Sequence, residues 1–202
     1  MNLEELEKQV ILMEDIQEIE HLQRRYAYYF DTHQWQSIVD LFSQDTEYVE
    51  LESVGRFVGK DAAKRFYVDM VGKKGEPIPA WIKYIVLQVG GVVDIDPGGR
   101  TAWGRFQTLL PEVMPFAGKL RQQWLHGYYE NRYVKENGRW LFLRLEWNVT
   151  FYTTYENGWL IQPLLGSLWN PEMRPDSPSH NFHPYPSGYH FPYHYKHPIT
   201  GA

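Results

Sequence analysis

The chain has 202 residues, a formal net charge of -5 and no cysteine, and aromatic residues make up 16% of it. This length suits a single domain with one hydrophobic core. Nucleic acids and anionic membranes are bound by clustered Lys and Arg, so the acidic balance argues against both partners. Without cysteine, disulfides, thiolate metal sites and a cysteine nucleophile are excluded, and chemistry must come from His, carboxylates, Tyr and Lys.

The sequence begins with an acidic stretch. Met1 to Ile19 mixes carboxylates with interspersed apolar residues, whereas a signal peptide has a basic flank and an unbroken apolar run. No segment approaches the roughly 20 consecutive apolar residues of a membrane-spanning helix. We therefore expect a cytoplasmic protein with no membrane partner.

Helical patterns dominate the first third of the chain. Apolar residues recur at helical spacing from Leu3 to Tyr29, and Gln34 to Phe42 repeats the pattern as a shorter helix. Thr46 to Leu51 is rich in strand-forming residues, and Gly55 to Gly59 has the composition of a turn. Asp61 is a suitable N-cap for a third helix that continues to Met70.

Strand patterns dominate the next part of the chain. Runs rich in β-branched and aromatic residues are separated by turn sequences, among them Asp96–Gly99 and Glu136–Gly138. Because these strands follow the helices instead of alternating with them, the order predicts an α+β fold, with helices covering one face of an antiparallel sheet. The predicted strands are Ala80–Val89, Gly91–Asp96, Thr101–Leu110, Gln122–Lys135 and Trp140–Tyr152.

The composition changes after about Gly158. Eight prolines interrupt a segment rich in Tyr, Phe and His, which excludes a long helix or a central strand. We predict a domain over residues 1–158 and an extended arm over residues 159–202 that packs on its own domain or on a neighbouring subunit. The arm's histidines suggest a metal site, and His190 and His194 have the i,i+4 spacing of a helical site, but Pro192 between them argues against a helix, so we expect no metal site. These histidines are His180, His183, His190, His194 and His197.

Several stretches of the chain resemble SnoaL-like proteins of the nuclear-transport-factor-two-like superfamily. The stretches from the first 60 residues resemble the opening of such proteins. The stretches after residue 126 resemble their final hairpin, in which a Gly-x-Trp element begins the last strand. The resemblance implies a cone-shaped, strongly curved antiparallel sheet, with N-terminal helices covering its open end and a ligand inside. The stretches are Tyr28–Trp35, Leu41–Phe42 and Gly55–Lys60, then Gly127–Tyr133 and Asn137–Trp140, within roughly Gln17 to Phe151.

The scytalone-dehydratase-like branch of that superfamily carries an Asp at the end of the first long helix, a His on the penultimate strand and an Asn on the last strand. Asp31, His126 and Asn148 stand at these positions. The branch also uses two tyrosines to orient a catalytic water, and Phe30 and Leu51 stand at these positions here. These departures leave the substrate and the exact reaction open.

The resemblance implies catalytic roles for Asp31 and His126. A carboxylate beside an imidazole fixes its tautomer and raises its basicity, which gives a general base near neutral pH. Alternatively, Asp31 caps the next helix, and His126 is a hydrogen-bonded core histidine.

Six further residues are candidates for substrate binding. Lys83 and Tyr84, which replace a second family histidine, open an apolar strand, so one of them faces the interior, although such a lysine more often extends to the rim. Trp124 shares a strand face with His126 and could wall the pocket, or be an ordinary core residue. Asn148 could donate to a substrate oxygen, or be a solvated strand residue. The candidates are Tyr29, Tyr48, Lys83, Tyr84, Trp124 and Asn148.

Together these features predict a cofactor-free lyase that acts on an aromatic, phenolic small molecule and either eliminates water or releases formaldehyde in a retro-aldol sense. Family members that deformylate lignin-derived diarylpropanes are similar in overall style. The alternatives are an isomerase or cyclase of the same fold, and a non-catalytic ligand-binding or assembly module. We expect a homo-oligomer, a dimer or a trimer. A ring-hydroxylating dioxygenase small subunit would instead need a large partner chain.

Overall fold

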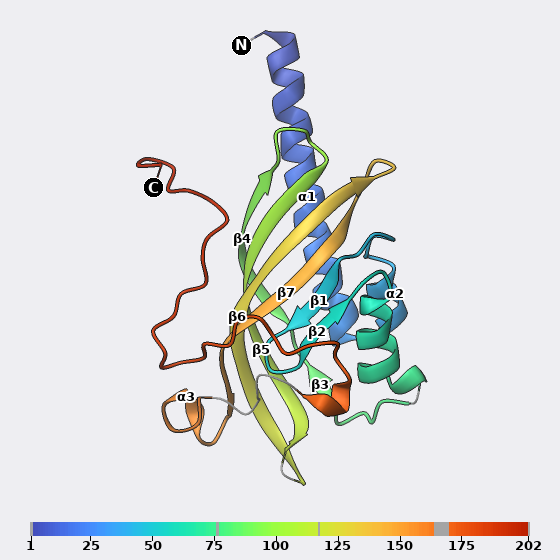
Figure 1. Cartoon of the computed structure of the whole chain (residues 1–202), viewed down its shortest axis with the longest axis vertical. Helices are drawn as coiled ribbons and strands as arrows, with labels where there is room; N and C mark the ends of the chain where they lie inside the picture. The colour runs from blue at the N-terminus through green and yellow to red at the C-terminus, as the bar shows by residue number, and fades with distance from the viewer. Residues whose placement is uncertain (1, 76, 117, 164–169, 202) are drawn as a thin grey trace.

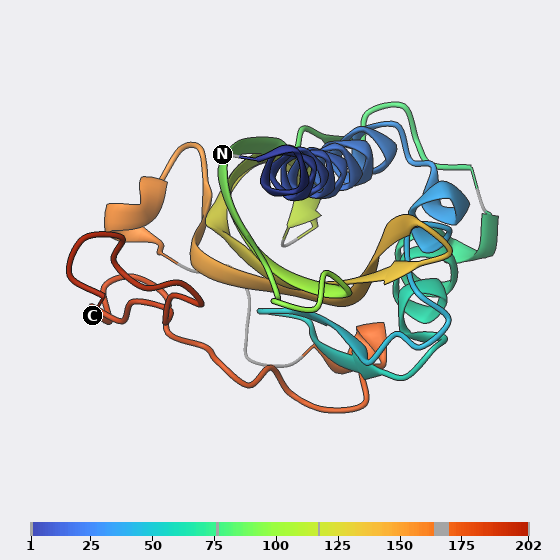
Figure 2. The ribbon, with the colours of Figure 1, turned by 90° about the horizontal axis from the view of Figure 1, so that it is seen from above.

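A long helix, α1 (Leu3–Asp31), begins the chain and lies along the concave side of the sheet (Figures 1 and 2). The computed structural model describes residues 2–75, 77–116, 118–163 and 170–201. The Asn2 side chain accepts a hydrogen bond from the Glu5 backbone, and the Glu5 carboxylate accepts one from the Asn2 backbone, each at 2.9 Å. Buried side chains begin at Asp15. The second half of α1 therefore supplies the residues that cover the sheet.

The remaining helical segments are short. The helix predicted from Asp61 to Met70 is confirmed in position, but most of it is a π-helix, in which the Gly72 backbone donates to the Tyr67 carbonyl at 2.8 Å. The short elements are α2 (Trp35–Val39), η1 (Lys64–Val71), η2 (Lys73–Gly75), α3 (Gly158–Ile161) and η3 (Pro171–Met173).

Seven strands of the described chain form one strongly curved sheet (Figure 2). The strand order is β2-β1-β7-β6-β5-β3, and β4 also pairs with β5. Three consecutive strands, β5 to β7, form a long meander that carries most of the sheet. The strands are β1 (Tyr48–Leu51), β2 (Gly55–Val58), β3 (Lys83–Tyr84), β4 (Leu87–Ile95), β5 (Thr101–Phe116), β6 (Lys119–Glu136) and β7 (Arg139–Thr154).

The predicted α+β class is confirmed, but the sheet differs from the prediction in two respects. It is mixed, because β1 runs parallel to β7; these strands are far apart in the chain, so no hairpin forces them to be antiparallel. The segment from Gly55, predicted as a turn, is strand β2. The turn lies just before it, at residues 52–54, and Gly55 begins the strand with a φ of 129°, which glycine tolerates.

The first long β-rich run is also divided elsewhere than predicted. The break falls at Ile85 and Val86, where the Val86 backbone donates to the Asp31 side chain instead of to a strand. At the predicted break, Gly90 is only a bulge within β4. A side chain from α1 therefore determines where this strand divides.

Side chains on β5, β6 and β7 alternate between two covered faces of the sheet. On β6, the hydroxyl groups of Tyr129 and Tyr133 bond to Tyr26 and Gln23 of α1. We call this side the inner face. Glu130, between them, instead contacts His194 of the C-terminal arm, on what we call the outer face. The even-numbered residues of this part of β6 share the outer face: Trp124, His126, Tyr128, Glu130 and Arg132.

The part of the predicted arm from residue 170 to residue 201 runs over the outer face and forms no strand there (Figures 1 and 2). Its first anchor is Asp176, which accepts hydrogen bonds from Arg65 and from the Val58 backbone. Further along, the Tyr185 backbone donates to the Thr150 carbonyl at 2.7 Å. The arm thus packs on the chain that carries it. None of the described helices is long and apolar enough to cross a membrane.

Gly127 lies at a bulge between β6 and β7, where a Cβ would sit 2.2 Å from the carbonyl oxygen of Asn148. We expect Gly127→Ala to lower the free energy of unfolding by about 2–3 kcal/mol, because two central strands would have to separate. Urea denaturation measures this change. Gly98→Ala is the control, since a Cβ there has no neighbour within 4 Å. Equal midpoints for the two variants would contradict the close approach.

Candidate functional site

The structure does not bring Asp31 and His126 together, so the expected contact between them is wrong. Asp31 ends α1 on the inner face, where its charge helps to raise the pKa of Tyr129. His126 lies on the outer face, packed between Tyr128 and Phe151. His126 and Trp124 share one face of β6, as predicted. The sequence did not indicate which face of that strand is directed toward α1.

Asp31 is a half-buried carboxyl at the open edge of the inner face. Its Oδ1 accepts a hydrogen bond from the Val86 backbone at 2.7 Å. Burial raises the pKa of Asp31, while that hydrogen bond and the charges of Lys83 and His33 oppose the increase. Asp31 therefore holds its proton more readily than a surface aspartate does.

Of the two residues that open the β3 run, Tyr84 faces the interior and Lys83 is exposed. The Tyr84 ring packs edge-on against Phe30 at 5.1 Å, next to Asp31 in sequence. The Lys83 ammonium extends back to the Asp31 carbonyl oxygen at 3.5 Å. Tyr29 lies on α1, half-buried against the core. Tyr84 is thus the member of the predicted set that shares the inner face with Asp31.

A second inner-face carboxyl, Glu112 of β5, was missed by the sequence analysis. Its side chain accepts a hydrogen bond from the Tyr152 hydroxyl at 2.8 Å, and only 8% of the residue is exposed. Burial raises the pKa of Glu112 to about 7, against the weaker effect of the Tyr152 hydrogen bond. Glu112 in turn contributes to raising the pKa of Tyr84, its partner across β3 and β5.

A signal for Glu112 was present in the sequence. Ala102, Phe106 and Leu110 alternate along β5 as inward-facing residues, and the same period continues to Glu112. The predicted strand ended at Leu110, because Pro111 follows it and proline lacks the backbone donor of a strand interior. Pro111 is nevertheless part of the strand, so the alternation continues through it.

Tyrosine hydroxyls line the inner face between the sheet and α1. Tyr67 and Tyr129 donate hydrogen bonds to the Tyr26 oxygen at 3.1 and 3.3 Å, and burial raises the pKa of all three well above its ordinary value. These phenols stay protonated and serve as hydrogen-bonding groups. Four further buried polar atoms nearby have no hydrogen-bond partner among the described residues: His33 Nε2, Trp35 Nε1, Thr108 Oγ1 and Trp147 Nε1.

His126 has a polar partner of its own on the outer face. Its Nε2 lies 2.8 Å from the Gln107 side-chain nitrogen, and its ring stacks on Phe151 at 5.5 Å. Burial lowers the pKa of His126, which favours the neutral imidazole at pH 7. Its Nδ1 has no hydrogen-bond partner in the described chain.

The other predicted residues also lie on the outer face. The Tyr48 hydroxyl donates to Glu146 at 2.8 Å, and Trp124 stacks on Tyr155. Tyr48 lines an open cavity of about 690 Å³ beneath the arm, and Asn148 lines a narrower one of about 230 Å³. The predicted set is therefore divided between two places that the sheet separates. Among the described residues, no group of three or more His, Cys, Asp or Glu side chains is placed to hold a metal ion.

The fold and the inner-face residues define a small α+β protein whose curved sheet is closed on one side by an N-terminal helix. The chain belongs to the SnoaL-like domain family, whose model matches residues 12–146. This match confirms the resemblance seen in the sequence motifs. No curated protein sequence matches the chain.

Solved structures share the fold at low sequence identity. A protein of Novosphingobium aromaticivorans, provisionally described as a scytalone dehydratase, is 22% identical with a TM-score of 0.59 over 73% of this chain and 91% of its own. A type 3 hexachlorocyclohexane dehydrochlorinase from Novosphingobium barchaimii is 15% identical with a TM-score of 0.60 over 72% and 93%. A protein with a cystatin-like fold, also from N. aromaticivorans, is 16% identical with a TM-score of 0.54 over 73% and 90%.

The raised pKa of Glu112 makes the stability of the fold depend on pH. Its pKa rises from 4.5 to about 7 on folding, so its contribution is full below pH 4.5 and is lost as the pH increases through about 7. As the pH increases from about 5 to about 8, the free energy of unfolding of Glu112→Gln should therefore increase relative to that of the wild type by on the order of 3 kcal/mol. Denaturation at several pH values measures the difference. The control, Glu172→Gln, alters an exposed carboxyl; a pH-independent difference for Glu112→Gln would contradict the buried titration.

Proposed function

We propose that this protein is a lyase that acts on a small aromatic, phenolic molecule without a bound cofactor, with Asp31 as general base and Glu112 as general acid. The observation that carries the proposal is that two carboxyl groups with raised pKa values, Asp31 and Glu112, lie on the same inner face. Tyr84 connects them: its ring packs against Phe30, the residue before Asp31, and the charge of Glu112 helps to raise the pKa of Tyr84 after burial. Groups whose pKa values approach the working pH are suited to proton transfer.

The lining of the inner face supports an aromatic substrate. The rings of Phe30, Trp35 and Tyr84 pack edge-to-face around the end of α1, at centroid distances of 5.1 to 6.3 Å. Such rings offer flat apolar surface to another ring. The unpaired nitrogens of His33 and Trp35 offer hydrogen bonds to substrate oxygens at the same place.

The proposed reaction assigns one proton transfer to each carboxyl group. Protonated Glu112 gives its proton to a benzylic hydroxyl, whose bond to carbon breaks, and water leaves. Ionised Asp31 then takes a proton from the neighbouring carbon, which forms a double bond. In the retro-aldol form, the ionised phenol of the substrate expels the benzylic hydroxyl as water, with the proton from Glu112, and leaves a quinone methide. Asp31 then takes the hydroxyl proton of the hydroxymethyl group, the carbon–carbon bond breaks and formaldehyde leaves. The electron pair of the broken bond forms the new double bond and restores the aromatic phenolate.

Two of the similar structures carry names of elimination reactions, scytalone dehydratase and hexachlorocyclohexane dehydrochlorinase. Both names describe loss of a leaving group together with a proton. They support a lyase over a binding module as the proposed role here. The substrate of this chain is proposed from its own aromatic lining.

Asp31→Asn should lower turnover of a phenolic diaryl 1,3-diol by about 100-fold or more, because the amide cannot accept the proton. The amide oxygen can still accept the Val86 hydrogen bond, so the fold should be retained. Formaldehyde release, ultraviolet absorbance and product mass measure the reaction. His126→Ala, on the outer face, should keep most of the turnover.

Either of two results would contradict this assignment. Loss of turnover in His126→Ala with full turnover in Asp31→Asn would place the chemistry on the outer face. A product with the mass of the substrate would indicate an isomerase.

Glu112→Gln should affect substrates according to their leaving group. Elimination of a hydroxyl group needs a proton, so the variant should slow it by about 100-fold, and the wild-type rate should decrease as the pH rises through about 7, where Glu112 ionises. A benzylic ether with 4-nitrophenoxide as leaving group needs no proton, so its turnover should be nearly unchanged. Equal losses for the two substrates would argue that Glu112 has no acid role.

A further inference from the structure

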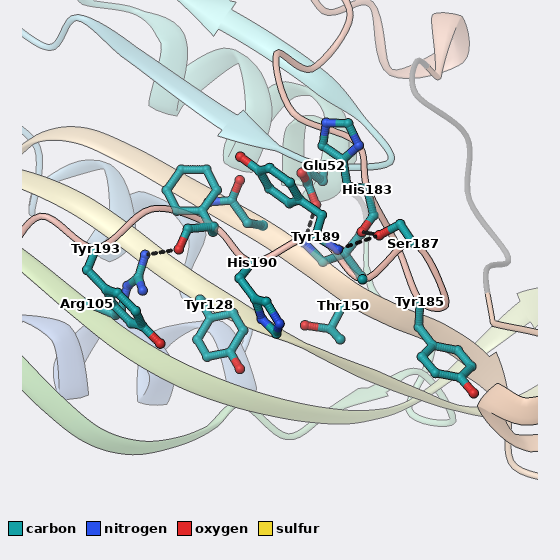
Figure 3. Close-up of a pocket in the computed structure, with 14 residues that line it drawn as sticks. Glu52, Arg105, Tyr128, Thr150, His183, Tyr185, Ser187, Tyr189, His190 and Tyr193 are labelled. Carbon is teal, nitrogen blue, oxygen red and sulfur yellow. Dashed lines mark hydrogen bonds between the residues drawn. The ribbon is translucent and has the colours of Figure 1, made fainter.

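A narrow cavity of about 230 Å³ lies between the outer face and the arm, on the other side of the sheet from Asp31 and Glu112 (Figure 3). Its floor consists of strand residues, among them Tyr128 and Asn148, and of Glu52 in the turn after β1; the arm supplies its roof, which includes Tyr189 and Phe191. The Tyr185 backbone bonds to the Thr150 carbonyl at 2.7 Å, which fixes the roof to the floor.

The floor presents a buried amide that lacks good partners. Asn148 is 5% exposed, and neither its Oδ1 nor its Nδ2 makes a hydrogen bond of ordinary length and angle within the described chain. Burial raises the pKa of Glu146, and an interaction with the Asn148 side chain opposes the increase. A buried amide without full hydrogen bonds costs free energy, and Asn148 is one of the residues that line the cavity. A ligand in the cavity could supply the missing hydrogen bonds.

Glu52 is the second polar group of the floor and is 3% exposed. One of its oxygens accepts a hydrogen bond from the Val149 backbone. Burial is the main cause that raises the pKa of Glu52 to about 8, and the charges of Glu50 and Glu146 add to it, against the Val149 hydrogen bond. At neutral pH this carboxyl is protonated, so it can both donate and accept hydrogen bonds.

The described lining of the cavity includes one arginine, Arg105, no lysine, and the histidines His183 and His190. The Nε of Arg105 pairs with Glu130 at 2.5 Å. Its other donors bond to the carbonyl oxygens of Phe191 and Pro192 at 3.2 and 2.5 Å. An anionic ligand would therefore have to displace existing bonds, whereas a neutral ligand would not.

Aromatic rings form much of the wall. Tyr128 belongs to β6, and Tyr189 and Tyr193 belong to the arm (Figure 3). The two arm tyrosines are 41% and 64% exposed. The arm thus holds large rings beside the cavity without burying them in the core. A flat ligand placed there would cover them and gain apolar contact.

We propose that this cavity is a second binding site, separate from the inner face, for a neutral hydroxylated aromatic molecule. Its hydroxyl or ether oxygens bond to Asn148 and Glu52, and its ring packs between Tyr128 and Tyr189. The site needs the arm in place, because the floor alone offers the polar groups without the opposing rings.

Guaiacol (2-methoxyphenol), a neutral phenol, is the probe, titrated into the full ¹⁵N-labelled chain. We expect saturable shifts of the backbone amide signals of Val149, Thr150 and Tyr189. Two matched probes test the chemistry: 2-methoxycyclohexanol lacks the aromatic ring, and benzoate carries a negative charge. Both should bind more weakly than guaiacol. Shifts confined to the inner face, no saturable shifts, or benzoate binding as tightly as guaiacol would overturn the proposal.

Variants test the assigned contacts. Asn148→Ala and Tyr189→Ala should each weaken guaiacol binding by roughly tenfold, and Tyr189 is exposed enough for its variant to fold. Glu52→Gln keeps a neutral hydrogen-bonding group and should bind nearly as the wild type does. Tyr28→Ala, on the exposed side of α1, is the control and should change nothing. Unchanged binding in both Asn148→Ala and Tyr189→Ala would refute the site, whereas Asp31→Asn should leave it intact.

Discussion

Alternation of side chains between two covered faces, along three long neighbouring strands, is the constraint on which the structure depends. Strands β5, β6 and β7 have 16, 18 and 16 residues, and both of their faces are covered over much of this length, one by α1 and the other by the arm. A slip of one residue in register would exchange the two faces completely. The two bulges in the pairing of β6 with β7 shift the alternation along β7, so that Phe142, Trp147 and Tyr152 all lie on the inner face.

Carboxyl groups with and without a cation partner behave differently. On the outer face, Glu130 pairs with Arg105 and Glu50 pairs with Arg56, whereas burial raises the pKa of Glu52 to about 8. On the inner face, Glu112 has a phenol for a partner and no adjacent cation, so burial raises its pKa toward neutrality. The pairs of Glu50 and Glu130 link strands to each other, and Glu130 also contacts His194 of the arm. A carboxyl without a cation can exchange a proton near pH 7, which is what acid–base chemistry requires.

The arm changes what the outer face can do. Polar groups such as Glu130 and Asn148 would face solvent if the arm were absent, and there they would need no further partners. Under the arm they are desolvated, and Glu130 gains His194 while Asn148 gains no well-aligned partner. The high content of aromatic residues and proline suits this role, since proline keeps the segment extended and the rings supply contact area without regular backbone pairing.

The sequence by itself determined the α+β class, the long first helix and the turns at Asp96–Gly99 and Glu136–Gly138, because these follow from local periodicity and turn chemistry. The family followed from the resemblance of its motifs to SnoaL-like proteins. The sequence also placed Asp31 at the end of a helix and put His126 on the same strand face as Trp124. Only the tertiary structure decided that this face looks away from Asp31, that β1 runs parallel to β7, and that Glu112 is buried beside Tyr152. The physical reason is that period-two patterns identify which residues share a face but not what covers it, and that burial, which sets the pKa of Glu112, arises from segments distant in the chain.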